Sequence, residues 1–510
     1  MHSNLCKHAL FCASLLLLAT TAAAKPKFVT YEKFGAKGDG KTDDLEAIIA
    51  AHEWANEKGL PVKAKAGKTY YIGGAAKTAI IKTDTDFTGA KFIIDDRQME
   101  NIKTSVFKVQ SYQESYVLKG VKSLHRGDTS IGKKLSGPAL LFVENSHKKV
   151  YIREGLNQNN GAPQREVVVV DADGNINPRT PVVFNFDEIT KITAFPIDEK
   201  ILTIKGGEFT TIANQAESKY NYHAHNIEID RSNTRVEGLT HLVTGEGDHG
   251  APYSAFLAIK QSYNVVIKDC LMTGRKIYGT IGSAKKPVNM GSYDLSAYCS
   301  ASCLWENCRQ TNSIDDRRYW GTHTSNYCKD LNMRGCVLSR FDAHMGVTDV
   351  TLTDCTFGHQ GVRMVGFGTI RFENVETHFP LMMSLRADYG SSWEGDIIIR
   401  NCKMICRSTD KGVQLVGGSN HGHHDFGYTC YLPSNITVDG LEIDDSAIKD
   451  KGYKGPAVFG TFNRKADEKG LLPYPAQGHV SLKGVTVKSG KPMRLSYNPK
   501  LFKGYEVEGL

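Results

Sequence analysis

Basic side chains recur at matching distances from two cysteines in the middle of the chain. His344 stands eight residues after Cys336, and Arg363 stands eight residues after Cys355. If each cysteine marks the same point of a structural repeat, side chains at equal distances from it stack on one face of that repeat. The positions four residues after the same cysteines add two further basic side chains to this face, Arg340 and His359.

The same alignment brings neighbouring segments beside the strand that holds His344. Towards the N-terminus these are residues 319–323, 296–298 and 258–260, and towards the C-terminus residues 385–389. Successive strands of a parallel coil lie about 4.8 Å apart, so one outward column of side chains can line a long groove. The predicted face concentrates the polar side chains of Lys260, Tyr298, His323, His344, Arg363, Arg386 and Asp388.

These residue types suit β-elimination from a uronic acid. The substrate carboxylate must be neutralised so that the proton at C5 becomes acidic, a base must remove this proton, and an acid can protonate the leaving oxygen. Arg363 and Arg386 can clamp the carboxylate through paired hydrogen bonds. His344 or His323, with an ordinary pKa of about 6.5, can act as the base. The other candidates are Lys260 as an alternative base, if its pKa is lowered, and Tyr298 or Tyr389 as the acid.

Further side chains on or near this face are predicted to bind the substrate. Trp320 and Trp393 can stack on sugar rings, although both are equally suited to packing inside the protein. A single histidine or arginine on a long solenoid is usually solvated or paired, and Arg386 with Asp388 can form a purely structural ion pair. The convergence of several such residues on one face is what favours a site. The predicted substrate-binding residues are Arg340, His359, Asp388, Tyr389, Trp320 and Trp393.

The elements that must position these side chains are the short strands of a repeat. Each copy has an alternating strand, then Asp, Asn or Gly, then a small apolar residue. The interval from Cys336 to Cys355 is 19 residues, that from Cys355 to Val375 is 20, and the others are 27 or longer. A period of about 20 residues, alternating strands and no helical pattern predict a β-solenoid with loop insertions. The small apolar residues then form one interior column: Leu239, Cys270, Cys308, Cys336, Cys355, Val375, Cys402, Leu441 and Val485.

The composition of the column also indicates whether its cysteines form disulfides. A ladder of disulfides is the alternative, but Val and Leu occupy the same column where no bridge can form. Reduced cysteine behaves there as a small hydrophobic residue. Five cysteines lie off the column, and some of these could pair: Cys299, Cys303, Cys328, Cys406 and Cys430.

The start of the repeat carries a family resemblance. Residues 34–48, with the sequence FGAKGDGKTDDLEAI, resemble the N-terminal motif of the pectate-lyase-like β-helix superfamily, which also holds tailspike-like proteins. The resemblance implies a capping helix, and Thr42 or Asp43 followed by the periodic run to Ala55 gives the expected helix start. The carboxylates of this motif then cap the helix and need no metal. The predicted fold is all-β, a right-handed parallel β-helix with an N-terminal capping helix.

Two shorter segments suggest a substrate. Residues 339–346 (SRFDAHMG) and 385–396 (LRADYGSSWEGD) resemble β-helical proteins of polysaccharide-degrading gut bacteria, among them glycosaminoglycan lyases. The resemblance implies a lyase that cleaves an acidic polysaccharide, of the chondroitin sulfate or hyaluronan type.

The first 24 residues read as a cleavable export signal, with Lys7, a short apolar run and a small-residue site at residues 22–24. The apolar run is shorter than the roughly 20 residues that span a bilayer, so we expect no transmembrane segment in the mature protein and a periplasmic or secreted location. Removing the signal deletes one lysine and no acid, which lowers the net charge from +8 to +7. With no basic run, this charge favours an acidic polysaccharide over nucleic acid. Residues 25–510 are predicted to form one domain with loop insertions, as a monomer.

Two other functions stay open at this point. A β-helical glycoside hydrolase would need two carboxylates, for which Asp315, Asp316, Asp342 and Asp388 are available, but the ordered polygalacturonase motifs are missing. Glycan binding without catalysis is the third possibility. Residues 421–425 (HGHHD) form an incomplete zinc set, calcium is compatible with the sequence but not required by it, and the repeat is hard to follow over residues 110–200.

Overall fold

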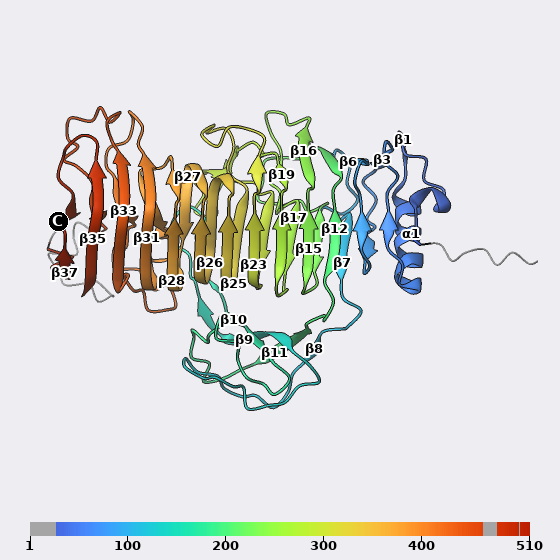
Figure 1. Cartoon of the computed structure of the whole chain (residues 1–510), viewed down its shortest axis with the longest axis horizontal. Helices are drawn as coiled ribbons and strands as arrows, with labels where there is room; N and C mark the ends of the chain where they lie inside the picture. The colour runs from blue at the N-terminus through green and yellow to red at the C-terminus, as the bar shows by residue number, and fades with distance from the viewer. Residues whose placement is uncertain (1–26, 463–476, 499) are drawn as a thin grey trace, which may run out of the picture.

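The computed structural model describes residues 27–462, 477–498 and 500–510. Within them, 31 strands join through parallel pairings into one elongated solenoid, with α1 at its N-terminal end (Figure 1). No helix of this part of the chain is long and apolar enough to cross a membrane. The predicted export signal lies outside the described residues.

Three parallel ladders run along the solenoid and form its walls. Long strands turn the corners and belong to more than one ladder: β25 (His323–Arg334), β26 (Val337–Thr353), β27 (Thr356–Met364), β31 (Trp393–Ile405), β33 (Asn435–Asp444) and β35 (Gln477–Val487). The first ladder adds β2 (Val62–Lys63), β5 (Thr85–Asp86), β12 (Leu202–Lys205), β15 (Thr234–Glu237), β18 (Val265–Lys268), β23 (Ala301–Glu306), β28 (Gly366–Glu373) and β37 (Gly504–Glu508).

The second ladder adds β1 (Asp39–Asp43), β3 (Thr69–Ile72), β6 (Lys91–Asp95), β13 (Glu208–Ile212), β16 (Thr240–Thr244), β19 (Leu271–Met272), β24 (Arg309–Gln310) and β29 (Glu376–Thr377). The third adds β4 (Ala79–Ile81), β7 (Phe107–Gln110), β14 (Ile227–Asp230), β17 (Leu257–Lys260), β22 (Leu295–Tyr298), β30 (Leu381–Leu385), β32 (Gln414–Gly417), β34 (Ala457–Phe459) and β36 (Arg494–Ser496). This third ladder carries the predicted face.

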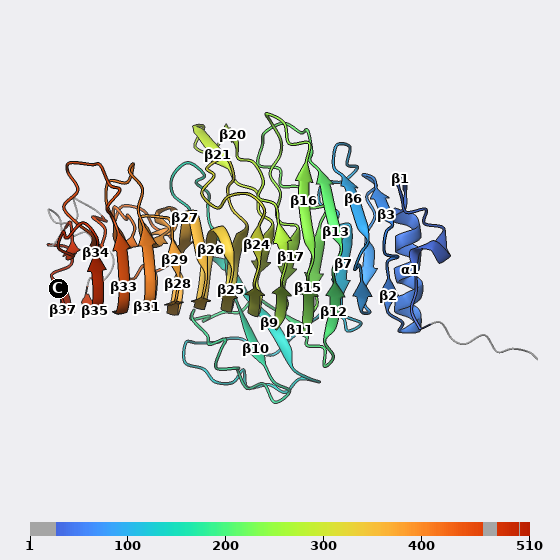
Figure 2. The ribbon, with the colours of Figure 1, turned by 45° about the horizontal axis from the view of Figure 1, so that its top comes forward.

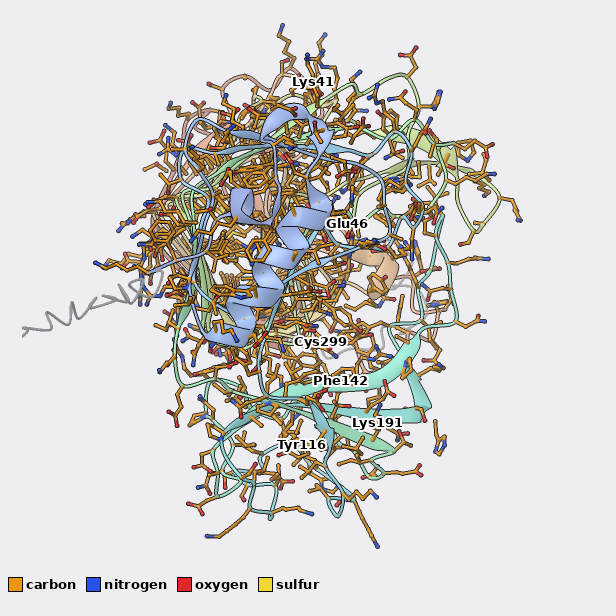
Figure 3. All side chains as sticks on the ribbon, turned by 90° about the vertical axis from the view of Figure 1, so that its right-hand side faces the viewer. Lys41, Glu46, Tyr116, Phe142, Lys191 and Cys299 are labelled. Carbon is orange, nitrogen blue, oxygen red and sulfur yellow. The ribbon has the colours of Figure 1, made fainter. Side chains whose placement is uncertain are left out.

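The cap at the N-terminal end is the helix α1 (Leu45–Lys58), preceded by the short 3-10 helix η1 (Tyr31–Phe34). Figure 3 shows α1 lying across the end of the solenoid. Its N-cap is Asp44, whose carboxylate accepts backbone hydrogen bonds from Lys37 (2.6 Å) and Gly38 (3.0 Å). The predicted start at Thr42 or Asp43 is therefore wrong by one or two residues. The hydrogen bonds from the loop hold the carboxylate of Asp44 at the N-cap. The helix covers strand edges that would otherwise be open.

The interior column is confirmed. Its residues are all fully buried except Val485, which is partly buried against the core. The residue before each column position has the left-handed backbone that Asp, Asn and Gly tolerate, as at Asp269 (φ 52°) and Gly335 (φ 63°). All ten cysteines of the described residues are free, so the expectation that some off-column cysteines pair is not met.

The chain leaves the solenoid after β7 and returns at β12, which explains the lost repeat over residues 110–200. In between, β8 (Tyr116–Val117), β9 (Ala139–Val150), β10 (Ala162–Val170) and β11 (Lys191–Pro196) form an antiparallel sheet in the order β10-β9-β11-β8. This lateral module has its own core and lies along one side of the solenoid (Figures 1 and 2). Leu140 and Val167 of the module pack in one apolar cluster with Cys299 of the solenoid.

A buried ion pair joins the lateral module to the solenoid. Lys329 of β25 binds Glu166 of β10, and their side chains are only 2% and 3% exposed. Glu166 also accepts hydrogen bonds from the backbone N–H groups of Val183 and Phe184, each at 3.1 Å. Because Glu166 is buried, water cannot stabilise its carboxylate if Lys329 is removed.

We therefore expect Lys329→Met to lower the stability of the docked module by about 3–5 kcal/mol, because Glu166 is left as a buried, uncompensated charge. The matched control is Lys134→Met, since Lys134 pairs with Asp173 on the module surface, where the side chains are 83% and 64% exposed. That change should cost less than about 1 kcal/mol. Calorimetric unfolding of both variants is the measurement, and equal transition temperatures would contradict the role given to the buried pair.

Candidate functional site

Two cavities adjoin on the third ladder. One, which we call the arginine pocket, has a volume of about 890 Å³, and the other, the lysine pocket, about 710 Å³. Both volumes lie in the usual range of ligand sites. The residues that line both pockets are Arg153, Asn157, Tyr220, Tyr222, Tyr293 and His344. His344 thus stands where the two cavities meet.

A wholly buried carboxylate, Asp342 of β26, organises the wall of the arginine pocket. Its Oδ2 atom lies 2.8 Å from Nε2 of His344, and its Oδ1 atom accepts a bond of 3.0 Å from Arg386. Arg340 also binds it. Burial alone would raise the pKa of Asp342, but the two arginines and the histidine hold that pKa well below its usual range. Asp342 is therefore ionised.

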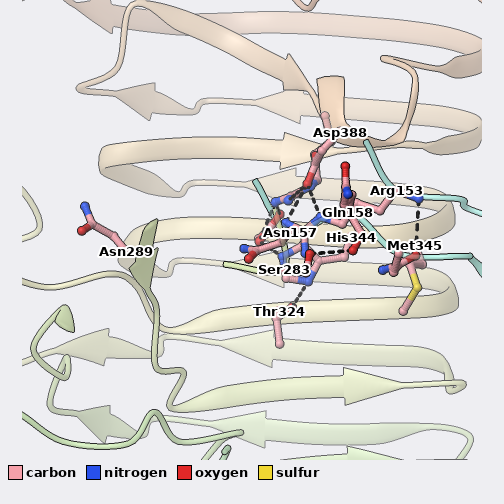
Figure 4. A network of polar contacts seen from close by, with 12 residues as sticks. Arg153, Asn157, Gln158, Ser283, Asn289, Thr324, His344, Met345 and Asp388 are labelled. Atoms are coloured by element: carbon pink, nitrogen blue, oxygen red, sulfur yellow. Dashed lines mark hydrogen bonds and ion pairs between the residues drawn. The ribbon is translucent and has the colours of Figure 1, made fainter. Parts of the chain in front are cut away.

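The ion-pair network continues outward to the lateral module. Arg386 donates to Asp388 at 2.7 Å and 3.1 Å, and Arg153 donates to Asp388 at 2.8 Å. Against the effect of burial, these two arginines keep the pKa of Asp388 below its ordinary value. Figure 4 shows Arg153, His344 and Asp388 gathered in this network. A continuous network of ion pairs, from Asp388 through Arg386 to Asp342, thus holds His344 in position.

His344 has one ring nitrogen directed at Asp342 and the other at Thr324. Its Nδ1 atom lies 3.2 Å from the hydroxyl of Thr324, and both residues line the lysine pocket. Burial lowers the pKa of His344, with Asp342 opposing this effect, so the ring is neutral near pH 7. An ionised Asp342 can only accept a hydrogen bond, so Nε2 carries the proton and Nδ1 is left as the acceptor, on the side of Thr324. In this arrangement Nδ1 is free of a proton of its own and could accept one.

Arg363 differs from the other arginines of its pocket. Its Nε atom donates to the carbonyl of Gln360 at 2.9 Å, and its guanidinium lies 5.1 Å from the ring centre of Phe379. Within the described residues no carboxylate lies within 4.0 Å of it, whereas Arg153 and Arg340 each have one and Arg386 has two. Burial, and then repulsion from Arg340, lower the pKa of Arg363 to about 10, so it remains charged. It is a cation positioned to receive an anion.

The strand pairing predicted by counting from the cysteines is wrong by two residues. Counting from the cysteines placed His344 opposite Arg363, but the ladder pairs Asp342 with Arg363 because a bulge follows Leu338. Since strand side chains alternate with a period of two, a shift of two residues leaves them on the same face. The predicted face therefore brings its residues together although the pairing within it is different.

The structure places most of the predicted residues around the two pockets. Lys260 binds Glu228, and the hydroxyl of Tyr298 accepts a 2.7 Å bond from Arg165. Burial raises the pKa of Tyr298 to about 12, so it stays protonated. The arginine pocket is lined by Arg340, Arg363, Arg386, Asp388, Trp320 and His344, and the lysine pocket by Lys260, Tyr298 and His344.

The prediction that His323 lies on this face is wrong. Its backbone pairs with Leu295, a core residue, so its side chain points into the solenoid and is wholly buried. The ring stacks on Phe341 at 4.9 Å and meets Trp305 edge-on at 4.4 Å. Desolvation lowers the pKa of His323 to about 3, which makes it a neutral core residue.

Three predicted residues do not reach the pockets. Trp393 is wholly buried and its ring N–H donates to the carbonyl of Asp396 at 3.3 Å, so it cannot stack on a sugar. Tyr389 is 4% exposed, under the guanidinium groups of the network. His359 is 7% exposed and binds the carbonyl of Tyr319 at 2.8 Å. Packing covers these residues and none of them lines either pocket, so the predictions that they bind substrate, and that Tyr389 is the acid, are wrong.

Several pocket residues were not predicted from the sequence. Arg153 comes from the lateral module, 235 residues before its partner Asp388, and the spacing of the repeat does not predict it. Tyr222 and Tyr293 lie on long insertions between strands. Thr324 could have been found, because strand alternation puts it outward once His323 is placed inward.

The histidine-rich segment at residues 421–425 has a structural role. His424 donates through Nε2 to the carbonyl of Ile152 at 3.0 Å, which ties the segment to the lateral module. In the part of the chain that the structure describes, no three His, Cys, Asp or Glu side chains are grouped so that they could hold a metal ion.

Comparison with known proteins identifies the fold class. No protein-family model matches the sequence, and no curated protein does. Among solved structures, the tailspike of Pseudomonas phage phi297 aligns with a TM-score of 0.52 and 12% identity, over 92% of this chain and 84% of that one. The tailspike of Acinetobacter baumannii bacteriophage AP22, solved with a capsular saccharide, gives 0.53 and 11%, over 94% and 79%. This likeness shows the fold alone, which is the right-handed parallel β-helix.

Proposed function

We propose that this chain is a polysaccharide lyase that cleaves a uronic-acid-containing glycan by β-elimination. One observation carries the proposal: a neutral histidine, His344, faces a cavity beside Arg363, a partly buried arginine without a carboxylate partner in the described residues. The first is a base and the second is a receptor for the substrate carboxylate. The saccharide bound to one of the tailspikes with this fold is consistent with a glycan ligand.

The proposed reaction follows from these positions. Arg363 pairs with the uronate carboxylate and stabilises the negative charge that develops on it as the C5 proton leaves. Nδ1 of His344 takes this proton, while the ionised Asp342 stabilises the imidazolium that forms. The electron pair of the C5–H bond forms the double bond to C4, and the C4–oxygen bond breaks. The departing glycosidic oxygen takes a proton, which completes the balance.

Tyr293 is the side chain that we assign as the acid. Its ring centre lies 6.2 Å from that of His344, and it lines both pockets. Burial raises the pKa of Tyr293, so its hydroxyl holds a proton that it can donate to the leaving oxygen. Tyr298, which the sequence suggests for this role, lines the lysine pocket but not the arginine pocket, and Arg165 donates to its hydroxyl.

The carboxylates of the hydrolase hypothesis are not suited to donate a proton to a leaving oxygen. An inverting or retaining glycosidase needs one carboxylic acid with a raised pKa as its proton donor. Here the arginines lower the pKa of both Asp342 and Asp388. Asp315, the other part of the hydrolase hypothesis with Asp316, pairs with His378 at 2.7 Å and lines neither pocket.

The charge of the arginine pocket supports an acidic substrate. Four arginines line it against two carboxylates, Glu154 and Asp388. With the sequence resemblance, this leads us to propose a glycan of the chondroitin sulfate or hyaluronan type, met outside the cytoplasm after export. Incubation with a panel of acidic glycans tests the proposal. Ultraviolet absorbance from the double bond conjugated to the carboxylate is expected, and new reducing ends without that absorbance would contradict it.

The pH dependence of the reaction follows from the pKa of the base. His344 must be deprotonated, so kcat/KM falls as the pH drops through its pKa in the free protein. Because burial lowers that pKa, the acidic limb should lie below the ordinary histidine value of about 6.5. Initial rates at low substrate concentration across this range measure the limb. A limb at or above that value would contradict His344 as the base.

A further inference from the structure

The two pockets lie in line along the solenoid. The lysine pocket is lined by Lys260 of β17, Tyr298 of β22 and Thr324 of β25, on the N-terminal side of His344. The arginine pocket is lined by Arg363 of β27 and Gln414 of β32, on its C-terminal side. A glycan that lies along the solenoid therefore has sugars on both sides of the base.

A segment of the lateral module, residues 153–158, crosses this groove; we call it the crossing segment. At one end, Arg153 binds Asp388, and the N–H of Glu154 donates to the carbonyl of Asp388 at 3.0 Å. The residue before it, Ile152, donates to the carbonyl of Phe426 at 3.0 Å. This end is thus fixed to the C-terminal coils.

The other end of the crossing segment is fixed to a different wall. That wall is the hairpin of β20 (Tyr278–Ile281) and β21 (Pro287–Met290). In the turn of the hairpin, the N–H of Ala284 donates to the carbonyl of Leu156 at 3.1 Å, and the hydroxyl of Ser283 donates to the carbonyl of Gln158 at 2.6 Å. Figure 4 shows Asn157, Gln158 and Ser283 close to His344.

The cavities lie between the crossing segment and the strands. Arg153 and Asn157 of the segment line both pockets, and so does His344 of the strand below. The segment also shares the ion-pair network of the base, since Arg153 and Arg386 both bind Asp388, and Arg386 binds Asp342. Lifting the segment would therefore break contacts that hold His344 in place.

We propose that the crossing segment closes the groove into a passage, which a polysaccharide enters by a chain end. This inference rests on the proposed function for its chemistry and adds the mode of attack. The interior of a long chain cannot pass beneath a segment that is anchored on both walls. Cleavage then proceeds from chain ends, and the products are of one short size from the start of the reaction.

The test uses acidic glycan chains in two forms, one with free ends and one with a bulky protein coupled to each end. A specific protease site inserted between Gly155 and Leu156, which are exposed, lies between the two anchored ends of the segment. After cutting, each half stays joined to β9 or β10, which pair with each other. The uncut insertion protein is the matched control. Binding of labelled chains and release of unsaturated product are both measured.

The native and uncut proteins are expected to bind free-ended chains at least an order of magnitude more tightly than blocked chains. After cutting, both forms should bind alike. Equal binding of both forms by the native protein would overturn the passage, and so would blocked chains that stay excluded after cutting. Selective binding of free-ended chains without unsaturated product would refute the lyase chemistry and leave the passage standing. Binding of neither form would overturn both.

Discussion

Replacing His344 with alanine is expected to lower kcat for glycan cleavage by a factor of about 100 to 10,000, the usual contribution of a general base. The reason is the position of its Nδ1 atom, which faces the pocket with the opposite nitrogen held by Asp342. Glycan binding should change little, because the neutral ring is not a receptor for the carboxylate. Steady-state kinetics and direct binding of the same glycan separate the two effects.

His378→Ala is the matched control for this variant. His378 also lies between two acidic side chains, Asp315 at 2.7 Å and Glu376 at 2.9 Å, but it lines neither pocket. Its removal should leave kcat unchanged. Full activity of the His344→Ala protein, or an equal loss in both variants, would show that the base lies elsewhere.

Replacing Arg363 with alanine is expected to lower kcat/KM by about 30- to 5,000-fold, which corresponds to about 2–5 kcal/mol for one partner of a charge pair that is buried once substrate binds. Among the arginines that line its pocket, it is the one with no carboxylate partner in the described residues, so substrate should supply that partner. Lysine at this position should restore only part of the rate, because its ammonium cannot form the paired bonds of a guanidinium.

A glycan whose carboxyl groups are esterified gives a sharper control. If Arg363 acts on the carboxylate, the native protein and the Arg363→Ala variant should differ much less on the ester than on the acid. Arg318→Ala, which removes an exposed arginine paired with Asp316, should have no effect on either substrate. The same loss on acid and ester would mean that Arg363 supports the fold of the pocket and does not bind the carboxylate.

The sequence was sufficient for the solenoid because one column recurs in every coil. Cysteine, valine and leucine alternate in that column after a residue that accepts a left-handed backbone, and both features depend on the strand-turn geometry alone. The face of the site could also be predicted. The bulge after Leu338 shifted the pairing by two residues, which preserves the side of the strand.

The errors arose where the repeat gives no information. His323 opens a strand after an insertion, so counting could not tell whether it points inward, and pairing with Leu295 places it in the core. Arg153 reaches the site from the lateral module, whose docking depends on a tertiary contact between Lys329 and Glu166. Spacing within a repeat cannot predict such a contact. The network around Asp342 therefore became visible only in three dimensions.

The central claim, elimination in place of hydrolysis, is tested most directly by cleaving an acidic glycan in water enriched with heavy oxygen. A lyase adds no water to the broken bond. The claim predicts products that carry a double bond, are lighter by one water than hydrolysis products, and contain no heavy oxygen when analysed by mass spectrometry. Products that contain one heavy oxygen at the new reducing end and no double bond would contradict it.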